Sequence, residues 1–77
     1  MKEFGRVLDP AVITANISRE RKRAGFHSKG AAAMALGISR PTYDKFERPE
    51  KLGFATLSEL EKLANLYGCP VERFFMD

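Results

Sequence analysis

Apolar residues recur along this chain at the three- and four-residue spacing of helices, not at the two-residue spacing of strands. One apolar stripe lies between residues 10 and 24 and consists of Val12, Ile13, Ile17 and Ala24. A second stripe consists of Leu57, Leu60, Leu63, Ala64 and Tyr67. No segment alternates apolar and polar residues with β-branched enrichment, so the pattern predicts an all-α fold.

Capping residues place the ends of these helices. Asp9 is a good N-cap, Pro10 suits the first helical position, and Gly25 ends that helix after a basic last turn. The run Thr56-Leu57-Ser58-Glu59 is a capping box for a later helix that ends at Gly68. We expect five short helices, over residues 9–24, 28–37, 39–48, 56–67 and 70–76, with a loop over 50–55.

Length and composition restrict the class of protein. The 77 residues suffice for one domain, which we place over residues 9–77 behind an N-terminal arm of residues 1–8. One cysteine, Cys69, and one histidine, His27, allow no internal disulfide and too few ligands for a metal site. The N-terminus does not resemble a signal peptide, and no run approaches the ~18 apolar residues of a membrane helix. We expect a cytoplasmic protein with no metal and no membrane partner.

The chain offers no arrangement typical of an enzyme. It has no Ser/His/Asp or Cys/His constellation, no phosphate-binding glycine loop and no paired carboxylates in an apolar setting. We therefore expect no catalytic residue and no cofactor.

Charge is unevenly distributed along the chain. Residues 1–48 carry ten Lys and Arg against five Asp and Glu, whereas residues 49–77 carry three against five. A basic N-terminal part favours a polyanionic partner. Ordinary solubilising charge explains the composition about equally well.

The segment LGISRPTYDKFERPEK, residues 36–51, carries the most informative pattern. Gly37 can adopt the left-handed conformation that ends one helix and turns the chain into the next. Ile38 would fill the angle between the two helices, and Ser39 would cap the second helix. The outward N-terminus of that helix would suit a phosphate. The arrangement is that of a helix-turn-helix.

The second of these helices has two different sides. Tyr43 and Phe46 lie three residues apart and, with Ile38, are expected in the core rather than stacked on bases. The other side would enter a major groove and read bases through Arg40, Pro41, Asp44 and Lys45. Arg40 can donate two hydrogen bonds to guanine, and Asp44 could accept one from cytosine or orient Arg40. Phosphate contacts are expected from Ser28, Lys29, Ser39, Thr42, Arg48 and Lys51.

These residues resemble the lambda-repressor-like (Cro/repressor, XRE-type) family of helix-turn-helix DNA-binding domains. The resemblance covers roughly residues 12–76 and rests on LGISRPTYDKFER, TLSELEKLANLYG and CPVERFF. It implies a five-helix fold with helix 39–48 in the major groove. It also implies a structural ion pair between Arg21 and Glu47.

The chain departs from the family pattern in the second helix. Lys29 stands where members usually have Gln, and Ala32 where they usually have Leu. Either Phe26 or Phe4 could fill the missing volume. Packing of Phe4 and Leu8 is our preferred role for the arm. Alternatively, Lys2 and Arg6 could reach a minor groove, or the arm could pair as a short strand in a dimer.

The favoured function is a sequence-specific transcriptional regulator, repressor- or Cro-like, that binds double-stranded DNA as a homodimer at a two-fold site. The expected dimer interface consists of Phe74, Phe75 and Met76. Control would come from protein concentration or a regulatory protein partner, an economy that resembles phage or mobile-element regulators. The alternative is a protein-binding module on the same fold, such as an antirepressor, an antitoxin-like partner or an adaptor.

Overall fold

A computed structural model describes residues 9–76, and this part of the chain is all-helical, as the apolar spacing predicts. The elements, with η for a 3-10 helix, are α2 (Pro10–Arg23), α3 (Lys29–Leu36), α4 (Arg40–Asp44), η1 (Pro49–Phe54), α5 (Leu57–Tyr67) and η2 (Val71–Phe75). The expectations for the arm, including those for Phe4 and Leu8, lie outside the described residues. Within residues 9–76 no helix combines the length and apolarity that crossing a membrane requires.

The predicted caps are present at both ends of the main helices. Asp9 accepts a hydrogen bond from the Ala11 N–H at 3.0 Å, and Thr56 and Glu59 form the predicted capping box. Gly37 and Gly68 end α3 and α5 with φ of 74° and 70°, the left-handed conformation that glycine adopts without strain.

The expected helix over residues 39–48 is shorter in the structure and ends at Asp44. Beyond it, the Phe46 and Glu47 N–H groups bond to carbonyls three residues back, so the chain tightens into turns. Arg48 is extended, with φ −117° and ψ 115°, because the residue before a proline is excluded from the helical region.

Two further segments differ from the prediction. The segment expected as a loop, residues 50–55, forms most of the 3-10 helix η1, and the last helix, η2, is also a 3-10 helix. A proline opens η1 and another caps η2, and a fixed φ near −65° is compatible with such tight turns.

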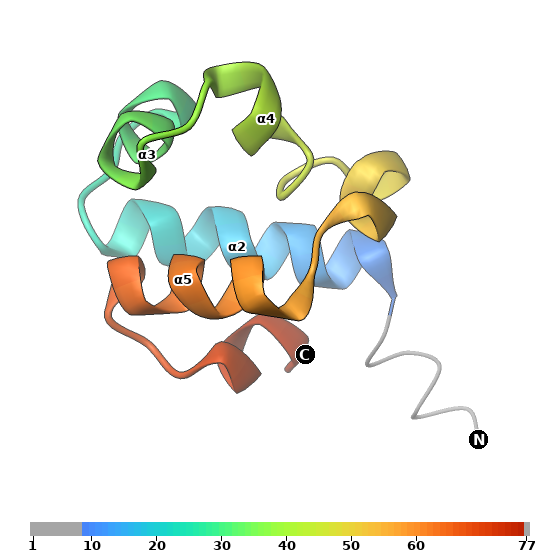
Figure 1. Cartoon of the computed structure of the whole chain (residues 1–77). Helices are drawn as coiled ribbons and strands as arrows, with labels where there is room; N and C mark the ends of the chain where they lie inside the picture. Colours follow the sequence, from blue (N-terminus) through green and yellow to red (C-terminus); the bar gives the residue numbers. More distant parts are fainter. Residues whose placement is uncertain (1–8, 77) are drawn as a thin grey trace.

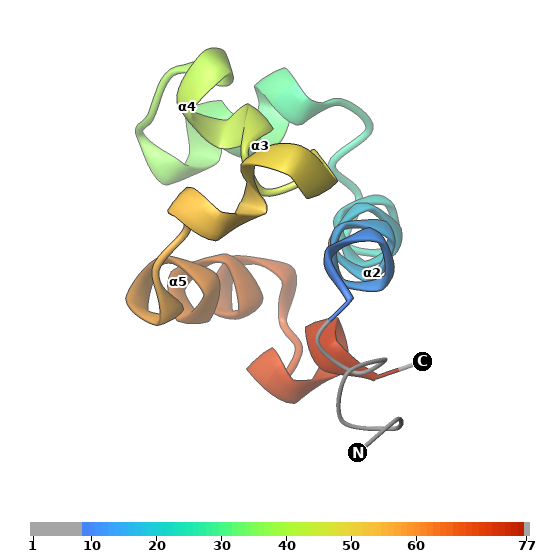
Figure 2. The same ribbon diagram turned by 90° about the vertical axis from the view of Figure 1, so that its right-hand side faces the viewer.

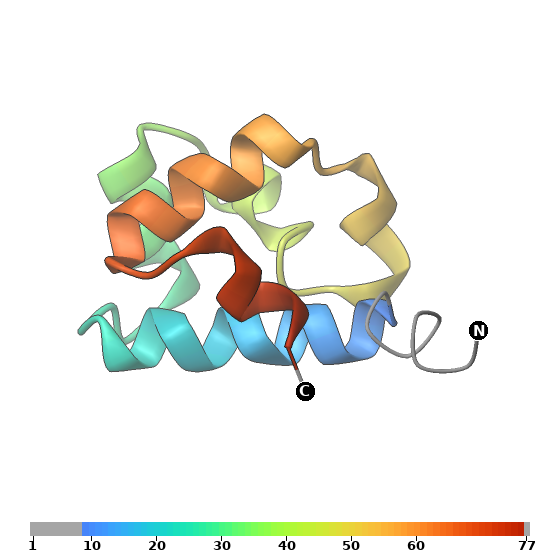
Figure 3. The same cartoon turned by 90° about the horizontal axis from the view of Figure 1, so that it is seen from below.

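The elements lie in three levels (Figure 1). α2 and α5 form the middle level and run side by side, as the views from the side and from below show (Figures 2 and 3). α3, α4 and η1 lie above them, and η2 crosses below, between the two long helices. α4 is therefore at the outer edge of the domain.

The core is formed by side chains from every level. Its buried apolar members are Ile13, Ile17, Ala32, Ala33, Tyr43, Phe46, Leu60, Leu63, Ala64, Tyr67 and Phe74. The inclusion of Leu57 in the α5 stripe was wrong: as the first helical residue it lies beyond the core and is 61% exposed. Of the two candidates for the volume beside Ala32, Phe26 is partly buried and packs on Tyr67 with ring centroids 5.7 Å apart.

A buried amide ties the first helix to the last element. The Asn16 Nδ2 atom donates to the carbonyls of Phe74, at 2.9 Å, and Met76. Its Oδ1 atom accepts a hydrogen bond from Arg19 at 2.8 Å. Because Asn16 is 3% exposed, these bonds supply the partners that a buried amide requires.

Candidate nucleic-acid interface

The first turn of α4 presents exposed side chains to solvent. Arg40, Pro41 and Thr42 are all exposed on the upper level of the domain. The Arg40 side chain passes beside Gly30 of α3, with its Cδ atom 3.8 Å from the position that a Cβ atom would occupy there. Within residues 9–76 no ion pair involves Arg40. The Arg40 guanidinium is therefore free of a carboxylate partner in this part of the chain.

The other two predicted base-reading residues are engaged within the domain. Lys29 Nζ lies 3.2 Å from Asp44 Oδ1, and Arg48 Nε contacts Asp44 Oδ2. Lys45 Nζ lies 2.9 Å from Glu59 Oε2 and 5.4 Å from the centre of the Phe46 ring. Both side chains are about one-fifth exposed, so neither extends freely into solvent as Arg40 does.

Of the three hydroxyl groups predicted to contact phosphate, those of Ser28 and Ser39 act as helix caps. Ser28 Oγ accepts a hydrogen bond from the Ala31 N–H at 3.0 Å. Ser39 Oγ accepts one from the Thr42 N–H at 3.2 Å and donates to Thr42 Oγ1 at 2.8 Å. All three hydroxyls are on exposed residues, so an incoming phosphate oxygen could still reach them.

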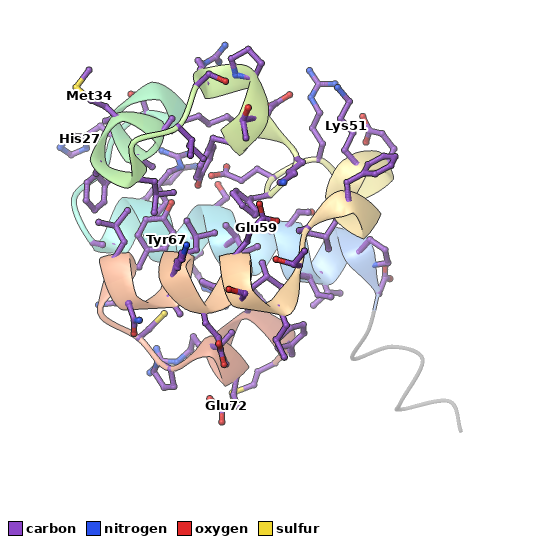
Figure 4. All side chains as sticks on the ribbon, in the orientation of Figure 1. His27, Met34, Lys51, Glu59, Tyr67 and Glu72 are labelled. Carbon is purple, nitrogen blue, oxygen red and sulfur yellow. The ribbon has the colours of Figure 1, made fainter. Side chains whose placement is uncertain are left out.

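The predicted basic phosphate contacts divide into two kinds. Lys29 and Arg48 share the Asp44 carboxylate, and Arg48 Nη1 also lies 3.4 Å from Glu50 Oε2. Lys51 of η1 is exposed on the same upper level as α4, and within residues 9–76 no ion pair involves it (Figure 4).

Behind α4, a buried network joins three helices. It consists of Arg21 on α2, Tyr43 on α4, Glu47 after α4 and Tyr67 on α5. Arg21 Nε donates to Glu47 Oε2 at 2.8 Å, and the two side chains are 6% and 4% exposed. The expected structural ion pair is therefore present.

The donors of the buried network converge on the Glu47 carboxylate, from the tyrosines on one side and Arg21 on the other. Tyr43 Oη lies 2.6 Å from Glu47 Oε2 and 2.5 Å from Tyr67 Oη. A carboxylate only accepts, so Tyr43 donates to Glu47, and Tyr67 must donate to Tyr43. Arg21 completes the network by also donating to the Phe26 carbonyl at 2.9 Å.

Burial and hydrogen bonding shift the acid–base equilibria of these groups. Burial raises the pKa of Tyr67 to about 12, and it raises the pKa of Tyr43 above its ordinary value. Burial lowers the pKa of Arg21, but the hydrogen bond and charge of Glu47 outweigh this effect, so the pKa is raised overall. At the surface, the hydrogen bonds from Lys29 and then Arg48 hold the pKa of Asp44 below its ordinary value.

The expected dimer interface requires one correction. Phe74 is fully buried in the core, because η2 turns its ring between α2 and α5, so it cannot contact a second chain. Phe75 is half-buried and Met76 is 57% exposed. The largest exposed apolar side chains elsewhere in residues 9–76 are Met34, Phe54 and Leu57.

Sequence reasoning missed several partners. Asp44 and Arg48 are four residues apart, a spacing typical of helical ion pairs that could have indicated their contact. Tyr67, by contrast, was placed only in an apolar stripe, and nothing local indicates that its hydroxyl reaches Tyr43. Within residues 9–76 no three metal-ligating side chains come together.

The basic side chains of Arg40 and Lys51 are both exposed, and this arrangement suits contact with an anionic surface.

Comparison of this chain with protein-family models, curated proteins and solved structures returns no match.

Proposed function

We propose that this protein is a sequence-specific DNA-binding transcriptional regulator with a lambda-repressor-like helix-turn-helix domain. The observation that carries the proposal is the two-sided placement of α4. Its first turn exposes Arg40, Pro41 and Thr42, while its inner side is joined to α2 and α5 through the buried network. A reading element needs exposed side chains on a backbone that is held in place.

The connection between α3 and α4 supports the same proposal. Gly37 is left-handed, and the Ile38 N–H donates to the Ala33 carbonyl at 3.0 Å, which closes the end of α3. Ser39 then caps α4 directly. The turn between the helices is therefore short, as in helix-turn-helix proteins.

The short length of α4 supports a dimer. Five helical residues reach only a few base pairs, and specificity then requires two copies on a two-fold site. We propose a cytoplasmic homodimer in which Arg40 reads a base and Lys51 contacts phosphate. In this proposal Ser28, Ser39 and Thr42 position the domain on the backbone.

The test is a selection from a random duplex library by the purified protein at near-physiological salt. Enrichment of an inverted repeat, with half-site centres about one helical turn apart, is the expected result. A folded protein that enriches no sequence would contradict the proposal.

Substitution of Arg40 tests its role at the selected site. Arg40→Ala should weaken binding by ~1–3 kcal/mol and relax the preference at one base position, because a bidentate contact to guanine is lost. Arg40→Lys is the matched control, since it keeps the charge without the planar fork. If Lys restores full affinity and preference, Arg40 is a phosphate contact instead.

A protein-binding module remains the second candidate, and one observation favours it. Phe54 is 76% exposed and Leu57 is 61% exposed, three residues apart across the η1–α5 junction. Exposed apolar groups of this size are common at protein interfaces. Binding to a protein through them would tolerate salt, whereas DNA binding through several phosphates would weaken steeply as salt increases.

A further inference from the structure

Asp44 occupies an unusual place for a residue at the end of a candidate recognition helix. Its two carboxylate oxygens hold two different cations, Lys29 from α3 through Oδ1 and Arg48 from the segment after α4 through Oδ2. We call these three residues the surface cluster. Both of its cations were predicted from the sequence to contact phosphate.

The surface cluster lowers the positive charge available on this level of the domain. Arg48 also approaches Glu50, at 3.4 Å, so two cations face two carboxylates and their charges cancel. Arg40 and Lys51, the exposed basic residues nearby, have no such partner within residues 9–76. The charge that remains available is therefore concentrated at Arg40 and Lys51.

The cluster is accessible enough to be rearranged. Asp44 is 19% exposed, Lys29 29% and Arg48 50%. Ion pairs at such positions are weak, because water screens the charges and the long side chains lose freedom when paired. A DNA phosphate must therefore compete with the Asp44 carboxylate for Lys29 and Arg48.

We propose that Asp44 is a specificity-determining residue that suppresses binding to non-cognate DNA by occupying Lys29 and Arg48; this inference rests on the proposed function. Non-specific affinity comes almost entirely from cations that neutralise phosphates. While the carboxylate holds two of these cations, random DNA gains fewer phosphate contacts. At the cognate site, base contacts from Arg40 hold the domain against the backbone, and this allows phosphates to displace the carboxylate.

Asp44→Asn is the direct test, because it removes the charge and keeps the size of the side chain. Glu72→Gln is the matched control. It removes the same single charge from η2, on the side of the domain opposite α4, where Glu72 is exposed (Figure 4). Each protein is titrated against two duplexes of equal length, one random and one carrying the selected site, over a range of salt concentrations.

The expected result is a gain in non-specific affinity that depends on salt. Release of two cations should steepen the slope of log affinity against log salt by up to about 1.8, at ~0.9 for each phosphate neutralised. The advantage of Asp44→Asn over the wild type on random DNA should then decline roughly tenfold between 50 and 200 mM salt. The ratio of specific to non-specific affinity should decrease, and Glu72→Gln should change neither slope nor ratio.

A double-mutant cycle separates this role from a structural one. Lys29→Ala should hardly affect random-DNA binding in the wild type, where Asp44 holds Lys29, and should weaken it in the Asp44→Asn background. Equal effects of Lys29→Ala in the two backgrounds would overturn the inference. Thermal melting of each variant verifies that it is folded at the assay temperature, and the same comparison with Arg48→Ala applies if Lys29→Ala is unstable.

The two proposals fail in different ways. If the wild type selects a site but Asp44→Asn leaves its salt slope and specificity ratio unchanged, the role of Asp44 is wrong and the regulator proposal stands. If the wild type binds neither duplex at low salt, both proposals are wrong.

Discussion

Two charged networks involve α4 and the residues after it, one in the interior and one at the surface, and they differ mainly in their exposure to water. The buried network links Glu47 to Arg21, with both side chains at least 94% buried, and adds two tyrosine hydroxyls. The surface cluster links Asp44 to Lys29 and Arg48, with side chains 19% to 50% exposed. Similar chemistry therefore serves two purposes. In the interior it fixes the position of α4, and at the surface it controls how much positive charge is available.

The difference follows from the cost of an unpaired charge. A charge left alone in the interior loses its hydration without compensation, so loss of one partner is strongly destabilising. A charge left alone at the surface is hydrated by water and stays available for a new partner. Three substitutions and one pH titration test this contrast, and they are given in order of decreasing expected effect on stability.

Loss of Glu47 should have the largest effect. Glu47→Ala leaves Arg21 buried without its carboxylate and should destabilise the domain by about 3 kcal/mol or more. For a domain of this size the melting temperature should then decrease by roughly 12 °C or more. Chemical denaturation measures the change, with Glu61→Ala on the exposed side of α5 as the control. An unchanged melting curve would show that the ion pair has no structural role.

Alkaline pH should act on the buried network through Tyr67. Folding raises the pKa of Tyr67 from 10.0 to about 12. The protonated hydroxyl therefore makes its full contribution to stability below pH 10, and this contribution is lost as the pH increases towards 12. The loss should reach about 2 kcal/mol after allowance for solvent screening. The chain has two tyrosines and no tryptophan, so tyrosinate absorbance reports on this network alone. Gradual ionisation near pH 10 in the folded protein would contradict the burial of both hydroxyls.

Removal of the Tyr67 hydroxyl should have a smaller effect. Tyr67→Phe keeps the ring packed in the core and loses one hydrogen bond to Tyr43, which should destabilise the domain by about 1 kcal/mol. Tyr43 still donates to Glu47, so no buried charge is left unpaired. Urea denaturation measures the difference, and a loss as large as that of Glu47→Ala would mean that the tyrosine pair, not the ion pair, fixes α4.

Neutralisation of Asp44 should have the smallest effect on stability. The hydrogen bond from Lys29 is the main reason why the pKa of Asp44 is lowered in the folded protein. Any stabilisation by this carboxylate is therefore present above the ordinary carboxyl pKa, and it is lost as the pH decreases towards the pKa of the folded state. Asp44→Asn should leave the melting temperature at neutral pH close to that of the wild type, because the cluster is exposed. A large decrease would place the surface cluster among the groups that hold the fold together.

The sequence predicted those features that depend on residues near one another in the chain. The caps at Asp9, Ser39 and Thr56 and the left-handed glycines Gly37 and Gly68 follow from local chemistry, and all are present. The end of α4 at Asp44 was missed, because it depends on Phe46 and Glu47 reaching partners in other helices.

The predicted site was less complete than the predicted fold, for the same physical reason. Arg40, Pro41 and Thr42 are exposed as expected, since their places on the helix follow from periodicity. The ion pairs of Asp44 with Lys29 and of Lys45 with Glu59 join residues 15 and 14 positions apart. Such contacts depend on how the helices pack, and helical spacing alone does not indicate them.

The Asn16 bonds to the carbonyls of Phe74 and Met76 also determine when this chain can finish folding. The bonded residues are 58 and 60 positions apart, so the segment from Asn16 to Met76 must be synthesised before both bonds can form. Closing such a segment costs chain entropy that must be lost before the contact can stabilise it. Until η2 packs against α2 and α5, the Asn16 Nδ2 atom lacks both of these carbonyl partners and must be hydrated instead. Docking of η2 is therefore the step that allows the Asn16 amide to be buried.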